Sequence, residues 1–441
     1  MNKRRVAILL EFGFHEIKKY IHSGFIDTLK LEFDIIWIAL NKNSIDFDDY
    51  FKKTGYPIIY VEEKEIYSAP SLLEKLNSVV RKNWLISRDF GSFHNHVRIQ
   101  KRSFKTKVLG NWILKNLLEK ITLIEVKRRY NNKYIESIFN EFEIDQIFTT
   151  GVSSSFAKYT IIEAQKKQIP VNYLINSWKD LYINNFVPFK DLASLFVWSN
   201  RMKIDYLAHM PYLNHEQIIV SGNPTFDVLV DSSPINDREY YANKYGLDLN
   251  SKWILYTMMP PRLTQDEIDT ILYTAQEINK SFSESKFSII IKRNPEHSAF
   301  DFKDTKFPKN VILADHFCFF DKKNDMIVQS KDGENEWLDL LRYSVLNLSV
   351  PSTVTLEFLT LGKPVFNIAY NSQGNIDTRI EQFFNAGFYH PLFNDHRVQK
   401  IESSDMLINK LRELNSFVSL DEPKRKNAGQ VIVDHILKIQ L

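Results

Sequence analysis

Short apolar runs alternate with longer amphipathic segments along most of the chain. The runs are rich in Val, Ile and Leu and are bounded by polar or turn-forming residues, which is typical of strands buried on both faces of a parallel sheet. The amphipathic segments between them predict the helices that cover such a sheet, so the fold class is predicted to be α/β. The expected strands are Val6–Leu10, Ile35–Leu40, Ile58–Val61, Gln146–Thr149, Val171–Ile175, Leu195–Trp198, Ile218–Val220, Trp253–Met258, Phe287–Lys292, Val311–Leu313, Val345–Val350 and Pro364–Ile368.

A polar stretch at 231–251, which includes the letters SSPINDRE, interrupts this alternation. The chain has 441 residues, more than one hydrophobic core usually serves. We therefore predict two doubly wound, Rossmann-like domains, 1–230 and 252–441, with 231–251 as the linker. Such sheets bind ligands outside the carboxyl ends of their strands, so the two domains are expected to face a cleft. Apolar residues at helical spacing predict a closing helix within 422–441.

The segment 345–368, VLNLSVPSTVTLEFLTLGKPVFNI, predicts a strand, a hydroxyl-rich turn, a helix and a second strand. Pro351 ends the first strand because proline has no N–H to donate to the ladder. Ser352 is expected to cap the helix, and the first-turn N–H groups around Thr353 and Thr355 favour an anion.

This helix is expected to be amphipathic. Leu356, Phe358, Leu359 and Leu361 are predicted to turn inward. Glu357 is then left on the exposed face, where its carboxylate can accept hydrogen bonds from a ribose diol.

The segment 345–368 resembles the donor-nucleotide motif of GT-B glycosyltransferases, and of the UDP-GlcNAc 2-epimerase-like and CDP-glycerol glycerophosphotransferase-like proteins that share their fold. A second stretch, from ASLFVWSN at 193 to SGNPTFDVL, is similar to the end of the amino-terminal domain in that branch. The resemblance implies that Ser352 and Thr353 meet the nucleotide phosphates and that Glu357 meets the ribose. Asp227, in the second stretch, is expected to cap a helix or anchor the linker rather than to act in catalysis.

Three cations at expected strand ends of the second domain are further phosphate candidates. The letters IIIKRNP at 289–295 stand where related transferases often carry Lys-Pro-His-Pro, and Asn294 replaces that histidine. Lys292 is predicted to stabilise the departing phosphates, and Arg293 and Asn294 to line the nucleotide. Arg262 follows the first strand of this domain and offers a bidentate fork to a diphosphate.

In the first domain, the loop that follows the strand at 146–149 is expected to line the acceptor side through Gly151, Ser153 and Ser154. Trp178 follows the next strand. Its ring either stacks on a sugar or packs in the core.

A transferase that inverts the anomeric configuration of the sugar needs a base near the acceptor hydroxyl. His15 follows the first strand and Glu11 lies just ahead of it, so these two are the candidate catalytic groups. The sequence carries no Asp-x-Asp pair at an expected strand end, and we predict catalysis without a metal or other cofactor.

Composition narrows the function classes. The 57 Lys and Arg nearly balance the 54 Asp and Glu, which argues against a dedicated nucleic-acid binder. A single cysteine, Cys318, excludes an internal disulfide and a cysteine-rich zinc site. No uncharged apolar stretch is long enough for a transmembrane helix, and a cytoplasmic protein is predicted.

Charge is concentrated in one segment, 97–133, which holds eleven Lys or Arg and two acids for a net charge of +9. Apolar residues are interleaved with these cations. The segment is either a solvated outer helix face or a peripheral contact with an anionic membrane.

Together these features predict a glycosyltransferase that moves a sugar from a nucleotide-sugar donor to a surface-polysaccharide or lipid-linked acceptor. A 2-epimerase-type isomerase of UDP-sugars, a polyol-phosphate transferase and a non-catalytic binding subunit remain as alternatives.

Overall fold

In the computed structural model the chain forms two compact units. The first unit is built from the described residues within 1–94, 99–228 and 426–441, and the second from those within 229–425. The structure describes residues 3–11, 16–40, 51–62, 70–87, 104–130, 132–151, 154–183, 191–210, 212–260, 266–283, 285–294, 302, 305–315, 318–321, 326–384, 386, 388–417 and 426–439.

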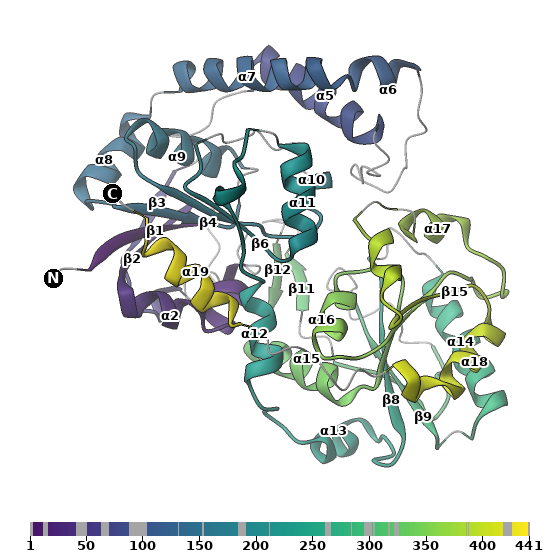
Figure 1. The fold of residues 1–441 in the computed structure, drawn as a ribbon. Helices are drawn as coiled ribbons and strands as arrows, with labels where there is room; N and C mark the ends of the chain where they lie inside the picture. The colour runs from purple at the N-terminus through teal and green to yellow at the C-terminus, as the bar shows by residue number, and fades with distance from the viewer. Residues whose placement is uncertain are drawn as a thin grey trace. The chain divides into compact units, whose positions relative to one another are not determined.

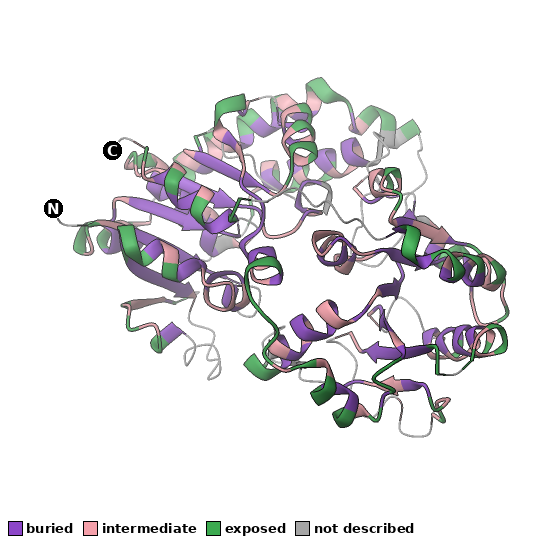
Figure 2. Cartoon of the chain, turned by 60° about the horizontal axis from the view of Figure 1, so that its bottom comes forward, coloured by how far each residue is buried: buried purple, intermediate pink, exposed green. Residues whose placement is uncertain are grey.

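The first unit contains a seven-stranded sheet in the order β3-β2-β1-β4-β5-β6-β7 (Figure 1). Every neighbouring pair is parallel. The strands are β1 (Arg4–Leu10), β2 (Phe33–Leu40), β3 (Ile58–Val61), β4 (Gln146–Thr149), β5 (Val171–Leu174), β6 (Ser194–Val197) and β7 (Ile218–Val220). All seven predicted strands are thus confirmed within a residue or two at their ends. Residues of the central strands are buried on both faces, which explains their continuous apolar runs (Figure 2).

Helices connect these strands. They are η1 (Ile17–His22), α2 (Phe25–Glu32), α5 (Leu72–Ser87), α6 (Phe104–Leu109), α7 (Trp112–Arg129), α8 (Lys133–Glu141), α9 (Ser155–Lys166), α10 (Asp180–Ile183), α11 (Asn200–His209), η2 (His215–Gln217) and α12 (Pro224–Asp231).

The closing helix, α19 (Ala428–Ile436), packs in the core of the first unit. Its residues Ile432, Val433 and Ile436 are buried there. The carboxylate of Asp227 accepts hydrogen bonds from the backbone N–H groups of Ala428 and Gly429, at 2.8 and 3.1 Å. Asp227 therefore caps a helix about two hundred residues away, which is a structural role.

The second unit contains a six-stranded parallel sheet in the order β10-β9-β8-β13-β14-β15. Its strands are β8 (Lys252–Thr257), β9 (Phe287–Lys292), β10 (Val311–Leu313), β13 (Leu346–Ser349), β14 (Val365–Ile368) and β15 (Val398–Ile401). The five predicted strands are confirmed, and β15 is additional. An antiparallel pair, β11 (Cys318–Asp321) and β12 (Met326–Gln329), was also not predicted.

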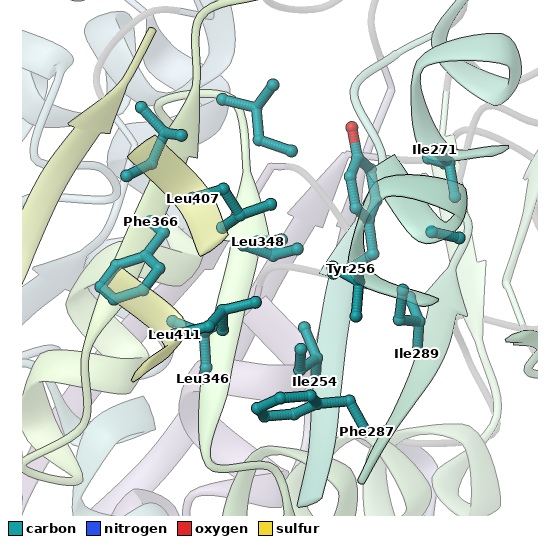
Figure 3. Packing of buried hydrophobic residues seen from close by; sticks show 14 of the residues in the cluster. Ile254, Tyr256, Ile271, Phe287, Ile289, Leu346, Leu348, Phe366, Leu407 and Leu411 are labelled. Carbon is teal, nitrogen blue, oxygen red and sulfur yellow. The ribbon is translucent and has the colours of Figure 1, made fainter. Parts of the chain in front are cut away.

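Aliphatic and aromatic side chains from one face of these strands pack against those of two helices, α14 (Glu267–Ser281) and α18 (Ser404–Arg412), to form a core cluster of the second unit (Figure 3). Its helices are α13 (Arg238–Tyr245), α14 (Glu267–Ser281), α15 (Lys331–Tyr343), α16 (Val354–Thr360), α17 (Thr378–Phe384), η3 (His390–Asn394), α18 (Ser404–Arg412) and η4 (Leu414–Phe417). The predicted α/β class, with two parallel sheets covered by helices, is confirmed.

Candidate functional site

Both sheets have the Rossmann strand order, and this order fixes where ligands bind. The order reverses between β1 and β4 in the first unit and between β8 and β13 in the second. In open parallel sheets the binding crevice lies outside the carboxyl ends of the strands at such a switch point. The residues after β1 and β4, and those after β8 and β13, are therefore the candidate site residues of the two units.

Glu11 follows β1 directly and is nearly buried. Its carboxylate accepts a hydrogen bond from the hydroxyl of Ser154, which follows β4. The same hydroxyl oxygen accepts from the backbone N–H of Ala157 at 3.1 Å and so caps α9. The contact joins the two strands of the switch point, and it brings together one predicted catalytic residue and one predicted acceptor-side residue.

Two buried acids and a buried lysine extend this site. Glu16 is fully buried and accepts from the backbone N–H of Glu11 at 2.6 Å. The ammonium of Lys19 donates to the side-chain oxygen of Asn176 at 3.0 Å. Asp180 accepts from the backbone N–H groups of Asn176 and Ser177, both at 2.9 Å. We name Glu11, Glu16, Lys19, Ser154 and Asp180 the acidic edge.

Burial shifts the titration of two groups at the acidic edge toward neutral pH. Loss of hydration lowers the pKa of Lys19 to about 8, although the carboxylates of Asp180 and Glu16 oppose the shift. Loss of hydration also raises the pKa of Asp180 to about 6, against the opposing effects of its backbone hydrogen bonds and of Lys19. Groups with such pKa values are suited to exchanging protons near neutral pH.

The other predicted residues of the first unit have different surroundings. Trp178 is buried, which agrees with the packing alternative rather than with an open stacking surface. Gly151 lies in the turn after β4, where its N–H donates to the hydroxyl of Thr149 at 3.1 Å. His15 and Ser153 lie outside the described residues.

In the second unit, β13 leads into the segment Pro351–Thr355, which we name the hydroxyl turn. The helix begins at Val354, and Thr353 is its N-cap residue without a side-chain capping bond. The prediction that Ser352 caps the helix is therefore wrong. The hydroxyl oxygen of Ser352 is buried and makes no hydrogen bond within the part of the chain that the structure describes.

Thr355 is fully buried and its hydroxyl is already used. The Tyr389 hydroxyl donates to the side-chain oxygen of Asn367 at 2.6 Å. Its single proton is thereby committed, so Thr355, whose hydroxyl oxygen is 2.6 Å from that of Tyr389, must be the donor in their contact. Through this hydrogen bond to Tyr389, Thr355 stabilises the position of the hydroxyl turn.

Glu357 is nearly buried, so the prediction that it is exposed is wrong. The inner face of α16 is formed by Thr355, Glu357 and Phe358, whereas the three predicted leucines are only half-buried. The indole N–H of Trp337 lies 3.5 Å from a carboxylate oxygen of Glu357, a long contact at the limit of a hydrogen bond. The helix thus starts one residue later than expected, and it packs by a different face.

Lys292 ends β9 and belongs to a buried ion-pair network. Its ammonium lies 3.0 Å from a carboxylate oxygen of Glu336 and donates to the backbone oxygen of Asp315 at 2.8 Å. The second oxygen of Glu336 accepts from Lys244 at 2.6 Å and from the hydroxyl of Tyr245 at 2.8 Å.

The remaining phosphate candidates of the second unit give less information. Arg293 and Asn294 follow β9 and are half-buried. Arg262 lies outside the described residues. Among the residues that the structure describes, no cluster of three or more His, Cys, Asp or Glu side chains has a geometry that would hold a metal ion.

No protein-family model matches the sequence, and a search of curated proteins finds no match. Solved structures, however, match over nearly the whole chain. UDP-GlcNAc 2-epimerase from Neisseria meningitidis, bound to UDP-GlcNAc, aligns with a TM-score of 0.58 at 14% identity, over 99% of this chain and 100% of that chain.

Two further structures match similarly. UDP-GlcNAc 2-epimerase from Methanocaldococcus jannaschii aligns with a TM-score of 0.53 at 14% identity, over 99% of each chain. The S. aureus MnaA–UDP co-structure aligns with a TM-score of 0.55 at 11% identity, over 99% of this chain and 96% of that chain. At such identities the likeness establishes the fold, which is the GT-B-like fold that the sequence predicted.

Proposed function

We propose that the chain is a glycosyltransferase that moves a sugar from a nucleotide-sugar donor to a saccharide or lipid-linked acceptor. The observation that carries this proposal is the hydroxyl turn at the switch point of the second sheet. It presents a buried Ser352 hydroxyl that has no hydrogen-bond partner among the described residues, just before a helix. Leaving a buried hydroxyl without a partner costs about 1 to 3 kcal/mol, and a phosphate oxygen of the donor would supply that partner.

The surroundings of the turn support a nucleotide over a simple anion. Glu357 offers a carboxylate on the next turn of the helix, and a carboxylate is the natural acceptor for the two hydroxyls of a ribose. The structures from Neisseria meningitidis and S. aureus, which share the fold, are described as bound to UDP-GlcNAc and to UDP.

We assign the proton-transfer step to the acidic edge. The oxygen of the acceptor hydroxyl forms a bond to the anomeric carbon of the sugar, and the bond from that carbon to the donor phosphate breaks. The nucleotide leaves with the bonding electron pair, and the hydroxyl proton passes to the carboxylate of Glu11. Ser154, already bonded to that carboxylate, orients it.

A second candidate is a 2-epimerase acting on a UDP-sugar, because the structures from Neisseria meningitidis and Methanocaldococcus jannaschii carry that name. The products separate the two activities. A glycosyltransferase releases a nucleoside diphosphate, whereas an epimerase returns a nucleotide-sugar of unchanged mass. A polyol-phosphate transferase would release a nucleoside monophosphate, since the group it moves carries its own phosphate.

Nucleotide binding is the first test. Thermal shift with UDP, GDP, CDP, dTDP and CMP should show one base that raises the melting temperature, since a ligand of the folded state stabilises it by mass action. With that nucleotide, Ser352→Ala and Glu357→Gln should each weaken binding by about 1 to 3 kcal/mol. Glu239→Gln, an exposed change in the same unit, is the matched control. Equal affinity in all four proteins would remove the turn from the binding site.

Activity is the second test. Incubation of the preferred nucleotide-sugar with protein, followed by mass spectrometry and NMR, identifies a released nucleotide or an isomerised sugar. We propose that turnover needs no divalent ion, so the rate should be unchanged in EDTA. Loss of activity in EDTA and its return with Mg²⁺ or Mn²⁺ would contradict this part of the proposal and leave the nucleotide assignment untouched.

A further inference from the structure

The helix α7 buries charged and polar side chains beside Leu118 and Val126, and it leaves a row of apolar side chains exposed. Lys115, Glu119 and Thr122 point into the protein and are at most 2% exposed. On the opposite side of the helix, Ile113 is 70% exposed, Leu117 53%, Ile121 40% and Ile124 52%. An ordinary surface helix of a globular protein turns its apolar stripe inward and its charges to water.

The inner face of α7 includes charged side chains, and these are held in ion pairs. A carboxylate oxygen of Glu119 lies 2.8 Å from the guanidinium of Arg81 on α5, and the other lies 2.9 Å from the ammonium of Lys115. Lys115 also donates to the backbone oxygen of His209 at 2.9 Å. A buried ion network is no more stabilising than well-packed apolar side chains would be, so the stability of the fold gives no reason for burying these charges.

Exposed apolar side chains continue onto the neighbouring helices. Leu72 on α5 is 82% exposed and Phe104 on α6 is 83% exposed. The three helices lie together at one edge of the first unit (Figure 1). We name the exposed apolar residues of these helices the apolar face: Leu72, Leu76, Val79, Phe104, Val108, Trp112, Ile113, Leu117, Ile121 and Ile124.

The charged side chains around the apolar face are of one sign. Among the described residues of α5, α6 and α7, the exposed charged side chains are all basic: Lys75, Lys107, Lys120, Arg128 and Arg129. The acidic side chains of these helices are not exposed. Glu74 and Glu119 are buried, and Glu125 is half-buried and accepts from the hydroxyl of Ser71 at 2.7 Å.

The exposed apolar residues and the basic residues around them indicate what kind of partner binds the apolar face. A second copy of the chain, docked by the same face, would set cations against cations. An anionic lipid surface satisfies both features, because its acyl region takes up the apolar side chains and its phosphates pair with the lysines and arginines around them. No helix in the described ranges is long and apolar enough to cross a bilayer, so the contact lies in the plane of the interface.

We propose that α5, α6 and α7 form a docking face for anionic membrane, with Ile113, Leu117, Ile121 and Ile124 inserted at the boundary between headgroups and acyl chains. The proposal stands on the exposure and charge of these helices alone and does not depend on the proposed enzyme activity. If both hold, the face brings the enzyme to lipid-linked acceptors.

The test is co-sedimentation of the purified full chain with vesicles of phosphatidylcholine containing phosphatidylserine, at low and high salt. Lys120→Gln/Arg128→Gln/Arg129→Gln should reduce partitioning by roughly 100-fold, since each surface cation contributes about a fivefold factor. Ile113→Gln/Leu117→Gln/Ile121→Gln should reduce it at least as much, because the inserted methylene groups are lost. Raised salt should weaken binding of the wild type.

A matched control replaces exposed apolar residues elsewhere in the first unit, Leu31 and Ile204, with Gln. It should bind vesicles within about twofold of the wild type, since these residues lie on α2 and α11 rather than on the three helices of the apolar face. All variants alter exposed side chains, and their thermal melts should match the wild type. A wild type that stays in the supernatant at low salt would overturn the proposal. So would a concentration-dependent dimer in sedimentation velocity that the Ile113, Leu117 and Ile121 variant abolishes, because a second copy would then cover the face.

Discussion

The two switch points share a strand order and differ in their chemistry. At the acidic edge of the first unit, ionisable groups are buried and hydrogen-bonded, and two of them have pKa values displaced toward neutrality. At the hydroxyl turn of the second unit, the groups are neutral hydroxyls, with Thr355, Tyr389 and Asn367 in a hydrogen-bonded row beneath the turn.

The difference indicates a division of labour. Carboxylates repel a phosphate, so the acidic edge is unsuited to a nucleotide but suited to accepting and returning protons. Neutral donors at a helix start attract a phosphate, and the one nearby carboxylate that we assign to the site, Glu357, is proposed to meet the ribose instead. In the proposed function the same topology serves as a proton-transfer site in one unit and as an anion site in the other, and the following experiments are directed at that contrast.

The largest expected effect is on turnover, from Glu11→Gln. Removing a general base typically lowers the rate by about 100- to 10,000-fold, and nucleotide affinity should be unchanged because the hydroxyl turn is intact. The measurements are turnover and nucleotide titration for the variant beside Glu216→Gln, an exposed change in the same unit. If the Glu11→Gln protein were as fast as the wild type, the base would be another residue. The proposed difference between a proton-transfer site in the first unit and an anion site in the second would then be contradicted.

Lys292→Ala tests whether charge also matters in the second unit. Removing one partner of a buried ion pair leaves Glu336 partly uncompensated, and we expect a loss of about 3 kcal/mol in the free energy of unfolding. If Lys292 also stabilises the departing phosphates, turnover of the folded variant should fall by roughly 10- to 1000-fold. Denaturant titration and steady-state kinetics are compared with exposed Lys286→Ala. Lower stability with unchanged turnover would restrict Lys292 to a structural ion pair.

The pH dependence of stability tests the acidic edge by itself. The pKa of Asp180 is raised from 3.8 to about 6, so between those values the folded chain holds a proton that the unfolded chain has released. The free energy of unfolding should therefore fall as pH rises from about 4 to about 6, by roughly 2 kcal/mol from this group. Asp180→Asn should lack that fall, whereas exposed Asp231→Asn should keep it. Parallel pH profiles for wild type and Asp180→Asn would contradict the burial argument.

The smallest expected effect comes from the cap of α19. Asp227→Ala should lower the free energy of unfolding by about 1 kcal/mol, the usual value of a lost helix cap. Nucleotide affinity should not change, since the hydroxyl turn belongs to the other unit. Denaturant titration beside Asp231→Ala gives the comparison. A drop in turnover as large as that of Glu11→Gln would mean that Asp227 acts in catalysis after all.

Most of the fold follows from the sequence because strands buried on both faces must be apolar throughout. The run Val6–Leu10 and the strand β1 are an example. The strand β15 was missed because its four residues, VQKI, include two adjacent polar ones, Gln399 and Lys400, which are half-buried at the edge of the sheet. The pair β11 and β12 was missed because a lone hairpin of two short strands has no long apolar run to mark it.

The candidate site was predicted less well, since side-chain burial depends on packing. The position of Ser352 after a buried strand was readable, but the start of α16 at Val354, and with it the burial of Glu357, was not. Neither Glu16 nor Lys19 was predicted to belong to the site, and charged residues of a helix usually face solvent. The structure shows that both side chains are buried. Several charged residues follow directly after the first buried strand, and this was a sequence signal that some of them belong to the site.

The position of α19 in the first unit has a consequence for biosynthesis. The described residues of the second unit lie within 229–425, and they are complete before α19 leaves the ribosome. The first unit, although begun earlier, still lacks Ile432, Val433 and Ile436 from its core at that time. The domain started first is thus finished last. A nascent chain stalled before residue 428 would leave core residues such as Phe25 without the packing of α19 and become a substrate for chaperones or proteases.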